Sequence, residues 1–299
     1  MDFNFELNKR VEYAEKVIQS YLISKEQAGN DRQAEIYEAM NYSVLAGGKR
    51  VRPILLLETS RLFGGKDEDV HAFMAAIEMI HTYSLVHDDL PAMDNDEFRR
   101  GRKTTHVVYG EAMGILAGDA LLNYAFETGL KGVTEAENTE NAVKALWVIA
   151  KKAGVSGMIG GQVVDIKNDN RCVDLDTLDY INELKTGALI EASMMAGAIL
   201  AGAAQEEVEI VERAASNIGR AFQIQDDILD VTGTKEILGK PVLSDEKNNK
   251  STYVTLLGTE NASDKVKELT EGAIKTLQQL NMENEFLYKL IYSLVYRKK

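Results

Sequence analysis

Residues 70–91 read VHAFMAAIEMIHTYSLVHDDLP. Apolar residues recur there at the i, i+3, i+4, i+7 spacing of one helix face, at Val70, Phe73, Met74, Ile77 and Ile80. The residue before a proline is biased away from the α region, so the helix should end or distort near Pro91. The stretch therefore predicts a long helix whose carboxyl end carries Asp88 and Asp89, where the helix dipole disfavours negative charge.

Helical periodicity recurs along the 299 residues, which contain only three prolines: Pro53, Pro91 and Pro241. Long tracts without proline suit long helices, because an interior proline removes a hydrogen bond and clashes with the preceding turn. The sequence contains no convincing series of alternating strand patterns. Polar segments near 167–176 and 232–252 are expected to be loops. The pattern predicts one large all-α domain over residues 1–299.

The composition limits where the protein acts and what it binds. A formal net charge of −13 disfavours nucleic acid and anionic membranes as partners. The single cysteine, Cys172, excludes a disulfide within the chain. The N-terminus lacks a secretory signal pattern, and the most apolar stretch, 192–204, is too short to span a bilayer. We therefore expect a cytoplasmic protein.

Several polar side chains should gather near the end of the first helix. His81 and Ser84 precede Asp88 by seven and four residues and therefore share its helix face. Asp94 would miss that face on a straight helix. A bend at Pro91 could bring Asp94 back beside Asp88.

Residues 86–101, VHDDLPAMDNDEFRRG, hold four aspartates, a glutamate and two adjacent arginines. A solvated acidic loop is one interpretation. The other is a site for a hard cation, because carboxylates without cysteine or paired histidines suit Mg²⁺ or Mn²⁺ better than Zn²⁺. In that case Arg99 and Arg100 would grip phosphate oxygens in bidentate pairs.

A second acidic cluster lies at residues 222–230, FQIQDDILD. Asp226 and Asp230 are one turn apart on one helix face, with Gln223 near the same face and Asp227 beside it. The solvated side of an amphipathic surface helix would give the same stripe, so that alternative stays open. If the two clusters face each other, they could hold several Mg²⁺ ions around one polyanion.

Basic residues follow a glycine pair at 47–53, GGKRVRP. Lys49, Arg50 and Arg52 could form a phosphate cradle. The segment is not a P-loop, because the spaced first glycine and the Ser/Thr after the lysine are missing. A helix C-cap with cations that suit the dipole is the alternative, and both interpretations can hold. Further along the chain, Lys185-Thr186 opens an alanine-rich stretch, and Lys240 lies in a polar loop.

Together these segments resemble the trans-prenyltransferases, the polyprenyl diphosphate synthases, and most closely the bacterial farnesyl diphosphate synthases. The resemblance extends from Gly47 to Lys250 in the expected order, through GGKRVRP, DDLPAMD, RRG, KTGAL, FQIQDDILD and GKP. It implies the all-α isoprenoid synthase fold, a single large helical bundle around a central cavity. It also implies a homodimer that depends on Mg²⁺, with about three ions per active site and Mn²⁺ as a substitute.

The resemblance assigns a role to each group of residues. The implied metal ligands are Asp88, Asp94, Asp226 and Asp230. The catalytic set would be Asp88, Asp89, Asp94, Lys185, Asp226 and Asp227. The diphosphate of isopentenyl diphosphate would be held by Lys49, Arg52, His81 and Arg100. The allylic diphosphate would be contacted by Arg99, Lys185, Thr186, Gln223 and Lys240.

The implied reaction is a head-to-tail (1′-4) condensation of isopentenyl diphosphate with dimethylallyl and then geranyl diphosphate. Tyr83 and Ser84 lie about 6–7.5 Å along the helix from Asp88, where a bulky residue would limit the growing chain. An aromatic residue at position 83 and four residues between Asp89 and Asp94 resemble bacterial farnesyl diphosphate synthases. We expect (2E,6E)-farnesyl diphosphate, the C15 product, together with free diphosphate.

Other functions remain open from the sequence. Geranylgeranyl or geranyl diphosphate synthases share the same motifs. A terpene cyclase shares an aspartate-rich first motif, but it would lack GGKRVRP and needs no isopentenyl diphosphate. A Mg²⁺-dependent diphosphate hydrolase fits the charge pattern, and a non-catalytic partner subunit should have lost some of the aspartates.

Overall fold

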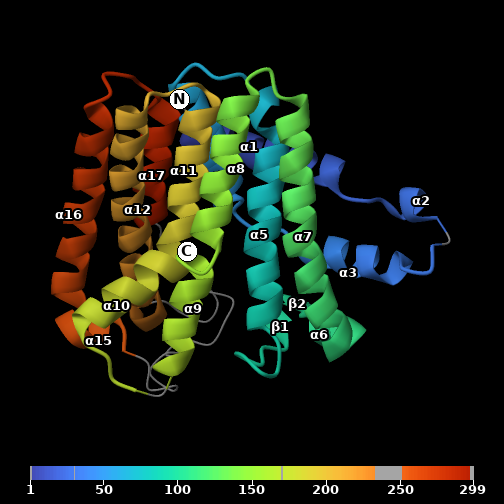
Figure 1. The fold of residues 1–299 in the computed structure, drawn as a ribbon. Coiled ribbons are helices and arrows are strands. Elements are labelled where there is room, and N and C mark those ends of the chain that lie inside the picture. The colour runs from blue at the N-terminus through green and yellow to red at the C-terminus, as the bar shows by residue number, and fades with distance from the viewer. Residues whose placement is uncertain (1, 30, 170, 233–250, 297–299) are drawn as a thin grey trace. The chain divides into compact units, whose positions relative to one another are not determined.

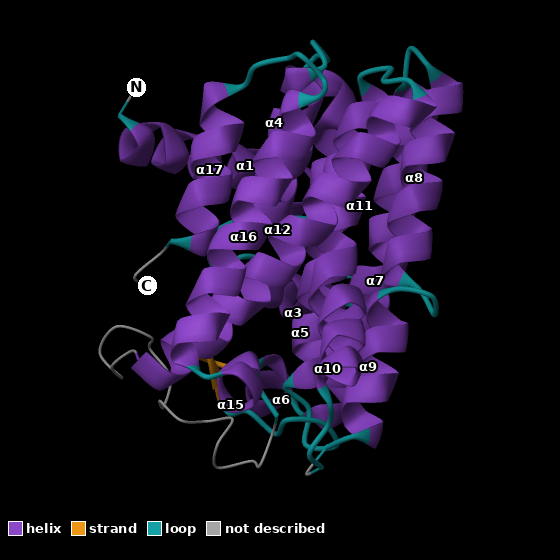
Figure 2. Ribbon diagram, turned by 90° about the vertical axis from the view of Figure 1, so that its left-hand side faces the viewer, coloured by secondary structure: helices purple, strands orange, loops and turns teal. Residues whose placement is uncertain are grey.

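The computed structural model describes residues 2–29, 31–169, 171–232 and 251–296. The chain divides into two compact units. The first comprises Met1–Leu57 and Lys66–Leu146, and the second comprises Glu58–Gly65 and Trp147–Lys299. Helices dominate the ribbon, and the described residues also contain a short pair of strands (Figure 1, Figure 2). The fold class is all-α, as the sequence predicted.

The first unit is built around a long buried helix. Its helices are α1 (Phe3–Tyr21), α2 (Lys25–Ala28), α3 (Ala34–Val44), α5 (His71–Asp88), α6 (Thr105–Tyr109) and α7 (Glu111–Glu135), with the 3₁₀ turn η1 (Glu68–Val70) before α5. Helix α5 packs most extensively against α7, which runs beside it (Figure 1). Nearly every side of α5 is buried, and apolar residues accordingly occupy most of its surface and not only one stripe.

The second unit has α12 at its centre. Its helices are α9 (Met158–Lys167), α10 (Leu175–Asn182), α11 (Ala188–Leu200), α12 (Gln205–Thr232), α15 (Tyr253–Leu257), α16 (Thr259–Gln278) and α17 (Glu285–Val295), with the π-helical turn η2 (Glu183–Gly187) before α11. Helix α12 packs against α16 and α11. Helices α4 (Val51–Leu62) and α8 (Thr139–Ala153) contribute residues to both units.

One feature of the first unit differs from the expected pattern. Strands β1 (Phe98–Arg99) and β2 (Arg102–Lys103) pair antiparallel, and they are the only strands in the part of the chain that the structure describes. Arg100 and Gly101 between them have φ of 52° and 74°. Two consecutive residues with positive φ suit the tight turn of a two-residue hairpin. A strand pair this short has no alternating pattern to detect in the sequence.

The predicted loops agree with the described residues in part. Helix α9 ends at Lys167 and α10 begins at Leu175, so the loop expected near 167–176 is confirmed. Most of the loop expected at 232–252, including Lys240 and Pro241, lies outside the described residues. Across the described ranges, no helix is long and apolar enough to cross a membrane.

Candidate active site

The carboxyl end of α5 brings Asp88 and Asp94 together. Helix α5 ends at Asp88, three residues before Pro91, as predicted. The backbone N–H of Asp94 then donates to the Asp88 carbonyl at 2.8 Å, and the N–H of Asn95 donates to the Leu90 carbonyl at 3.1 Å. The chain therefore folds back on the helix end, which confirms the predicted return of Asp94. The Asp94 side chain is exposed, while Asp88 is half-buried.

Asp89 faces inward and is bound by Arg99. Its side chain is buried, and one carboxylate oxygen, Oδ1, accepts a hydrogen bond from Nε of Arg99 at 2.7 Å and forms an ion pair with Nη2 at 2.7 Å. Burial raises the pKa of Asp89, and the arginine opposes that shift. The interpretation of this segment as a solvated acidic loop is therefore wrong for Asp89. Asp89 holds the guanidinium of Arg99 in place.

Four arginines surround His81 in the first unit. Burial lowers the pKa of His81 well below its ordinary value, and the charges of Arg52, Arg100, Arg99 and Arg50 lower it further. His81 is therefore neutral at neutral pH. Two of these arginines are paired with carboxylates, Arg50 with Glu78 and Arg99 with Asp89.

Arg52 has unused donor capacity within this cluster. Burial lowers its pKa to about 10, so the guanidinium is still charged at neutral pH. Its Nε is buried and has no hydrogen-bond partner among the residues that the structure describes. A buried donor without a partner costs free energy unless a ligand supplies an acceptor. Lys49, three residues earlier, is exposed.

The glycine pair makes room for Arg100. Nη1 of Arg100 donates to the Gly47 carbonyl, and a Cβ added at Gly48 would lie 2.7 Å from Cζ of Arg100. Gly48 also has a φ of +134°, which L side chains rarely adopt. The hairpin that carries Arg100 therefore packs directly on the GGKR backbone.

Arg50 caps the preceding helix, as the alternative interpretation of the GGKRVRP segment predicted. Its buried guanidinium donates to Oε1 of Glu78 at 2.7 Å and to the carbonyl of Val44, the last residue of α3, at 2.8 Å. Arg50 therefore satisfies a carbonyl at the end of α3. Arg52, two residues later, has an Nε without a hydrogen-bond partner among the described residues.

In the second unit, the other acidic cluster is more buried than a surface stripe would be. Asp227 and Asp230 are only 6% and 5% exposed, so the interpretation as the solvated side of an amphipathic helix is wrong for them. Asp227 accepts from the backbone N–H of Tyr253 at 2.8 Å and from Nε2 of Gln223 at 3.2 Å. Within the described ranges, Oδ1 of Asp230 is buried without a hydrogen-bond partner. Asp226 is half-buried.

Lys185 and Thr186 lie in the π-helical turn η2, immediately before α11. Nζ of Lys185 pairs with Oδ2 of Asp165 at 2.7 Å, and the Thr186 hydroxyl donates to Oε1 of Gln223 at 3.1 Å. A Cβ on Gly219 of α12 would lie 2.8 Å from Cα of Gly187, so glycine there lets α12 approach the turn closely. Turns of this kind are frequent at functional sites.

Tyr83 is buried on α5, one turn before His87. Its side chain is 6% exposed, and its hydroxyl has no hydrogen-bond partner in the described part of the chain. Burial, and then the charge of Asp88, raise the pKa of Tyr83 to about 12. Its ring meets the edge of His87 with 5.8 Å between centroids. Ser84 is half-buried, and its hydroxyl donates to the His81 carbonyl at 2.9 Å.

The acidic clusters consist of oxygen donors, which suit a hard cation. The described residues contain no group of three His, Cys, Asp or Glu side chains that could hold a metal ion by itself. Mg²⁺ does not require one, because it usually binds through one or two carboxylates together with waters and substrate phosphates. The unpartnered Oδ1 of Asp230 is an oxygen donor of that kind, and so are the carboxylates of Asp88 and Asp94, whose backbones are joined by a hydrogen bond. The residues present therefore fit Mg²⁺.

Sequence reasoning missed two carboxylates that the structure places beside predicted residues. Glu78 binds Arg50, and Asp165 binds Lys185. Glu78 is a charged residue inside the apolar pattern of residues 70–80, which is a detectable sign of a buried ion pair. Asp165 gives no comparable signal.

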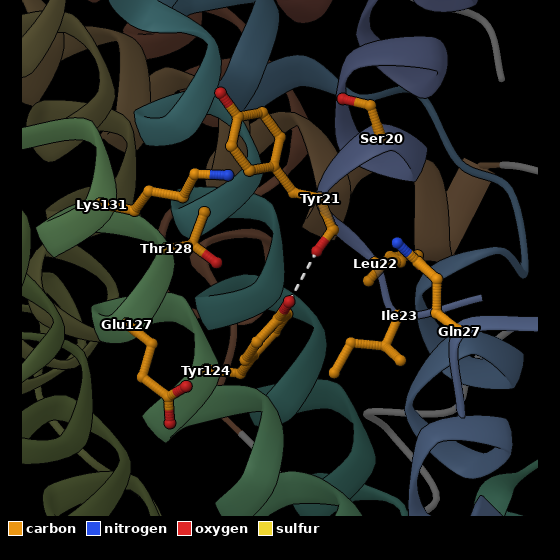
Figure 3. A pocket seen from close by; sticks show the side chains of 9 residues that line it. All are labelled: Ser20, Tyr21, Leu22, Ile23, Gln27, Tyr124, Glu127, Thr128 and Lys131. Carbon is orange, nitrogen blue, oxygen red and sulfur yellow. Dashed lines mark hydrogen bonds between the residues drawn. The ribbon is translucent and has the colours of Figure 1, made fainter. Parts of the chain in front are cut away.

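A cavity of about 280 Å³ in the first unit lies elsewhere (Figure 3). It is lined by Ser20, Tyr21, Leu22, Ile23, Gln27, Tyr124, Glu127, Thr128 and Lys131, and the Tyr124 hydroxyl donates to the Tyr21 carbonyl at 2.9 Å. None of these residues belongs to the predicted site. A second cavity, of about 30 Å³, is lined by Asp89 and Arg99 among others and has room for about one water.

The family model for polyprenyl synthetase matches residues 33–291. This chain belongs to the polyprenyl synthetase family. One curated relative of this polyprenyl synthetase is the farnesyl diphosphate synthase of Geobacillus stearothermophilus, 46% identical over 85% of this chain and 86% of that protein. Another is the chloroplastic geranylgeranyl pyrophosphate synthase of Capsicum annuum, 49% identical over 81% of this chain and 66% of that protein.

The solved structures agree with the family assignment. The FPP/GFPP synthase from Zymomonas mobilis has a TM-score of 0.84 and 32% identity to this polyprenyl synthetase, covering 98% of this chain and 100% of that one. The chain is thus a prenyltransferase with the all-α isoprenoid synthase fold, as the sequence predicted. The family acts on isoprenoid diphosphates and uses a divalent metal.

Proposed function

We propose that this prenyltransferase makes (2E,6E)-farnesyl diphosphate by adding isopentenyl diphosphate first to dimethylallyl diphosphate and then to geranyl diphosphate. The observation that carries the C15 product is Tyr83, a large side chain buried on α5 five residues before Asp88. Four residues between Asp89 and Asp94 support the same product through the resemblance to bacterial farnesyl diphosphate synthases.

Lys49, Arg52, His81 and Arg100 are proposed to hold the diphosphate of isopentenyl diphosphate. The support is the positive field around neutral His81 and the unpartnered donor of Arg52. This diphosphate stays on the product, so cations suffice to bind it and no group has to assist its departure. Arg100, held against the glycine pair, presents its charge without a large loss of side-chain freedom.

The allylic diphosphate must leave, and its departure needs stronger charge stabilisation. We assign Asp88, Asp94, Asp226 and Asp230 as ligands of Mg²⁺, which when bound neutralises the charge that grows on the leaving group. Arg99, Lys185, Thr186, Gln223 and Lys240 are proposed to contact the same diphosphate, with Asp89 fixing Arg99. Fixed cations that stabilise developing charge commonly supply a large share of the rate enhancement.

The carbon chemistry follows from the different fates of the two diphosphates, one of which leaves while the other stays. Loss of the allylic diphosphate leaves an allylic carbocation, and the double bond of isopentenyl diphosphate attacks it. A proton then leaves, with the departed diphosphate as its proposed acceptor, and a new double bond forms. Buried apolar side chains along α5 exclude the water that would capture the cation. Tyr83 is proposed to stop the tail after C15.

Geranylgeranyl diphosphate synthase is the second candidate, because relatives of that name are as similar to this chain as the farnesyl diphosphate synthases. A homodimer, a single functional domain over residues 1–299 and a cytoplasmic location also remain predictions.

Incubating the purified enzyme with labelled isopentenyl diphosphate and either dimethylallyl or geranyl diphosphate, with and without Mg²⁺, tests the proposal. We expect Mg²⁺-dependent label in a C15 product from both starters. A main product of C20 would favour the second candidate. Product formed without isopentenyl diphosphate would indicate a cyclase, and diphosphate release without chain growth a hydrolase.

A further inference from the structure

A chain of hydrogen bonds in the second unit joins residues that the sequence did not connect. It begins at Arg220 of α12, whose Nη2 donates to Oδ2 of Asp179 on α10 at 2.8 Å. The other oxygen of Asp179, Oδ1, accepts from the Tyr253 hydroxyl at 2.5 Å. Tyr253 is the first residue of α15 and is 1% exposed. Its phenol is therefore held in one orientation by a charged acceptor.

The chain continues through the Tyr253 backbone to the second acidic cluster. Its N–H donates to Oδ2 of Asp227, while Nε2 of Gln223 donates to Oδ1. The Gln223 carbonyl oxygen then accepts from the Thr186 hydroxyl. A carboxylate can only accept, so Asp227 requires the amide nitrogen of Gln223 to face it. That requirement turns the amide oxygen toward Thr186.

Both carboxylate oxygens of Asp227 are thus occupied by neutral donors from the protein, whereas Oδ1 of neighbouring Asp230 has no partner among the described residues. Asp227 is suited to orient its surroundings, and Asp230 is suited to accept a ligand. We infer that Tyr253 is a positioning residue. Asp179 and Arg220 hold its side chain, and its backbone N–H fixes Asp227. Asp227 in turn orients Gln223 and thereby Thr186, so the second acidic cluster and the π-helical turn keep the geometry needed for the allylic diphosphate and its Mg²⁺. This inference rests on the proposed function of those residues.

The local structure makes α15 dependent on these bonds. The helix has only five residues and is capped by Thr252 and Thr255, which satisfy its first turn. A helix this short has little stability of its own, so tertiary contacts decide where its first N–H points. The Tyr253 hydroxyl donates to Asp179 and also interacts with the side chain of Asn182, the last residue of α10. Tyr253→Phe removes both interactions of the hydroxyl and keeps the packed ring.

The competing explanation is that the Tyr253–Asp179–Arg220 contacts only tie α10, α12 and α15 together. That explanation predicts a lower melting temperature for Tyr253→Phe with unchanged substrate and metal parameters. A positioning role predicts a selective loss at one substrate site. Tyr180→Phe is the matched control, because Tyr180 lies next to Asp179 on α10 and is 53% exposed.

The experiment compares wild type, Tyr253→Phe and Tyr180→Phe in the condensation assay and by calorimetric titration with inorganic pyrophosphate in the presence of Mg²⁺. For Tyr253→Phe we expect the KM for geranyl diphosphate, the half-saturating Mg²⁺ concentration and the pyrophosphate Kd each to rise roughly 10-fold, as for partners that orient metal ligands. The KM for isopentenyl diphosphate and all values for Tyr180→Phe should stay at wild-type levels.

Equal rises in both KM values, or a lower melting temperature with no change in pyrophosphate Kd, would overturn the inference. If Tyr253→Phe does not fold, Asp179→Asn tests the same network from the acceptor side, with the same split expected. Product length in the wild-type reaction is read separately. A C20 wild-type product would therefore defeat the proposed C15 function without touching the positioning result.

Discussion

The two acidic clusters differ in what neutralises them. At the end of α5, Asp89 is bound by Arg99, and three further arginines lie near His81 in the same unit. On α12, Asp227 accepts hydrogen bonds from neutral groups, and Oδ1 of Asp230 has no partner in the described part of the chain. In the first cluster a protein cation is bound to one of the carboxylates, whereas in the second Asp230 offers a buried oxygen that can accept a ligand. Variants in each cluster should therefore fail in different ways.

The largest effect is expected on α12. Asp226→Ala should lower kcat by about 100- to 1,000-fold, the range seen when one group that stabilises developing charge is removed. Excess Mg²⁺ should restore little of it, because the ligand itself is gone. Steady-state assays over a Mg²⁺ series measure this, with Gln225→Ala on the same helix as the control. If Asp226→Ala lowers kcat less than threefold, the proposed difference in role between the two acidic clusters is contradicted.

A smaller and more selective effect is expected in the arginine cluster. Arg52→Gln removes a charged donor, which is worth about 1.5–3 kcal/mol, so the KM for isopentenyl diphosphate should rise roughly 10- to 100-fold. The KM for geranyl diphosphate and the Mg²⁺ requirement should not change. Arg102→Gln is the control, because Arg102 stacks on Tyr42 with its Cζ 4.2 Å from the ring centroid. A changed Mg²⁺ requirement in Arg52→Gln would contradict separate roles for the two clusters.

The smallest effect concerns pH. Burial and the arginines hold the pKa of His81 well below its ordinary value. In the unfolded chain an imidazole takes up a proton near pH ~6.5, whereas folded His81 stays neutral. The unfolded state thus binds more protons as the pH falls, so the free energy of unfolding decreases below about pH 6.5.

His81→Gln should remove this part of the pH dependence, which is at most about 1.4 kcal/mol per pH unit. Urea unfolding of wild type and variant at pH 7.5 and 5.5 measures it. Identical losses of stability in the two proteins would show that His81 is not held neutral by the arginine cluster.

The sequence predicted the features that depend on local spacing. Pro91 determines where α5 ends, and the backbone hydrogen bond between Asp94 and Asp88 realises the predicted bend. Asp226 and Asp230 lie on one face of α12 because they are four residues, about one helical turn, apart. Features that depend on distant partners could not be predicted: nothing near Asp165 indicates that it binds Lys185, twenty residues away.

Burial was the other unpredictable property. A polar stripe on an amphipathic helix has the same sequence whether solvent or another helix covers it, so only the structure shows that Asp227 and Asp230 are buried. The close approach of Gly219 to Gly187, beside the π-helical turn around Lys185, likewise joins residues far apart in the sequence. No local pattern specifies that contact.

The central claim is a prenyl transfer that stops at C15 because Tyr83 blocks further growth. Its most direct test is the size of the product made by wild type and by Tyr83→Ala from labelled isopentenyl diphosphate and geranyl diphosphate, with Tyr180→Ala as an exposed tyrosine control. We predict C15 for wild type and the control, and C20 or longer chains for Tyr83→Ala. A wild-type product of C20 or longer, or an unchanged C15 product from Tyr83→Ala, would contradict the claim.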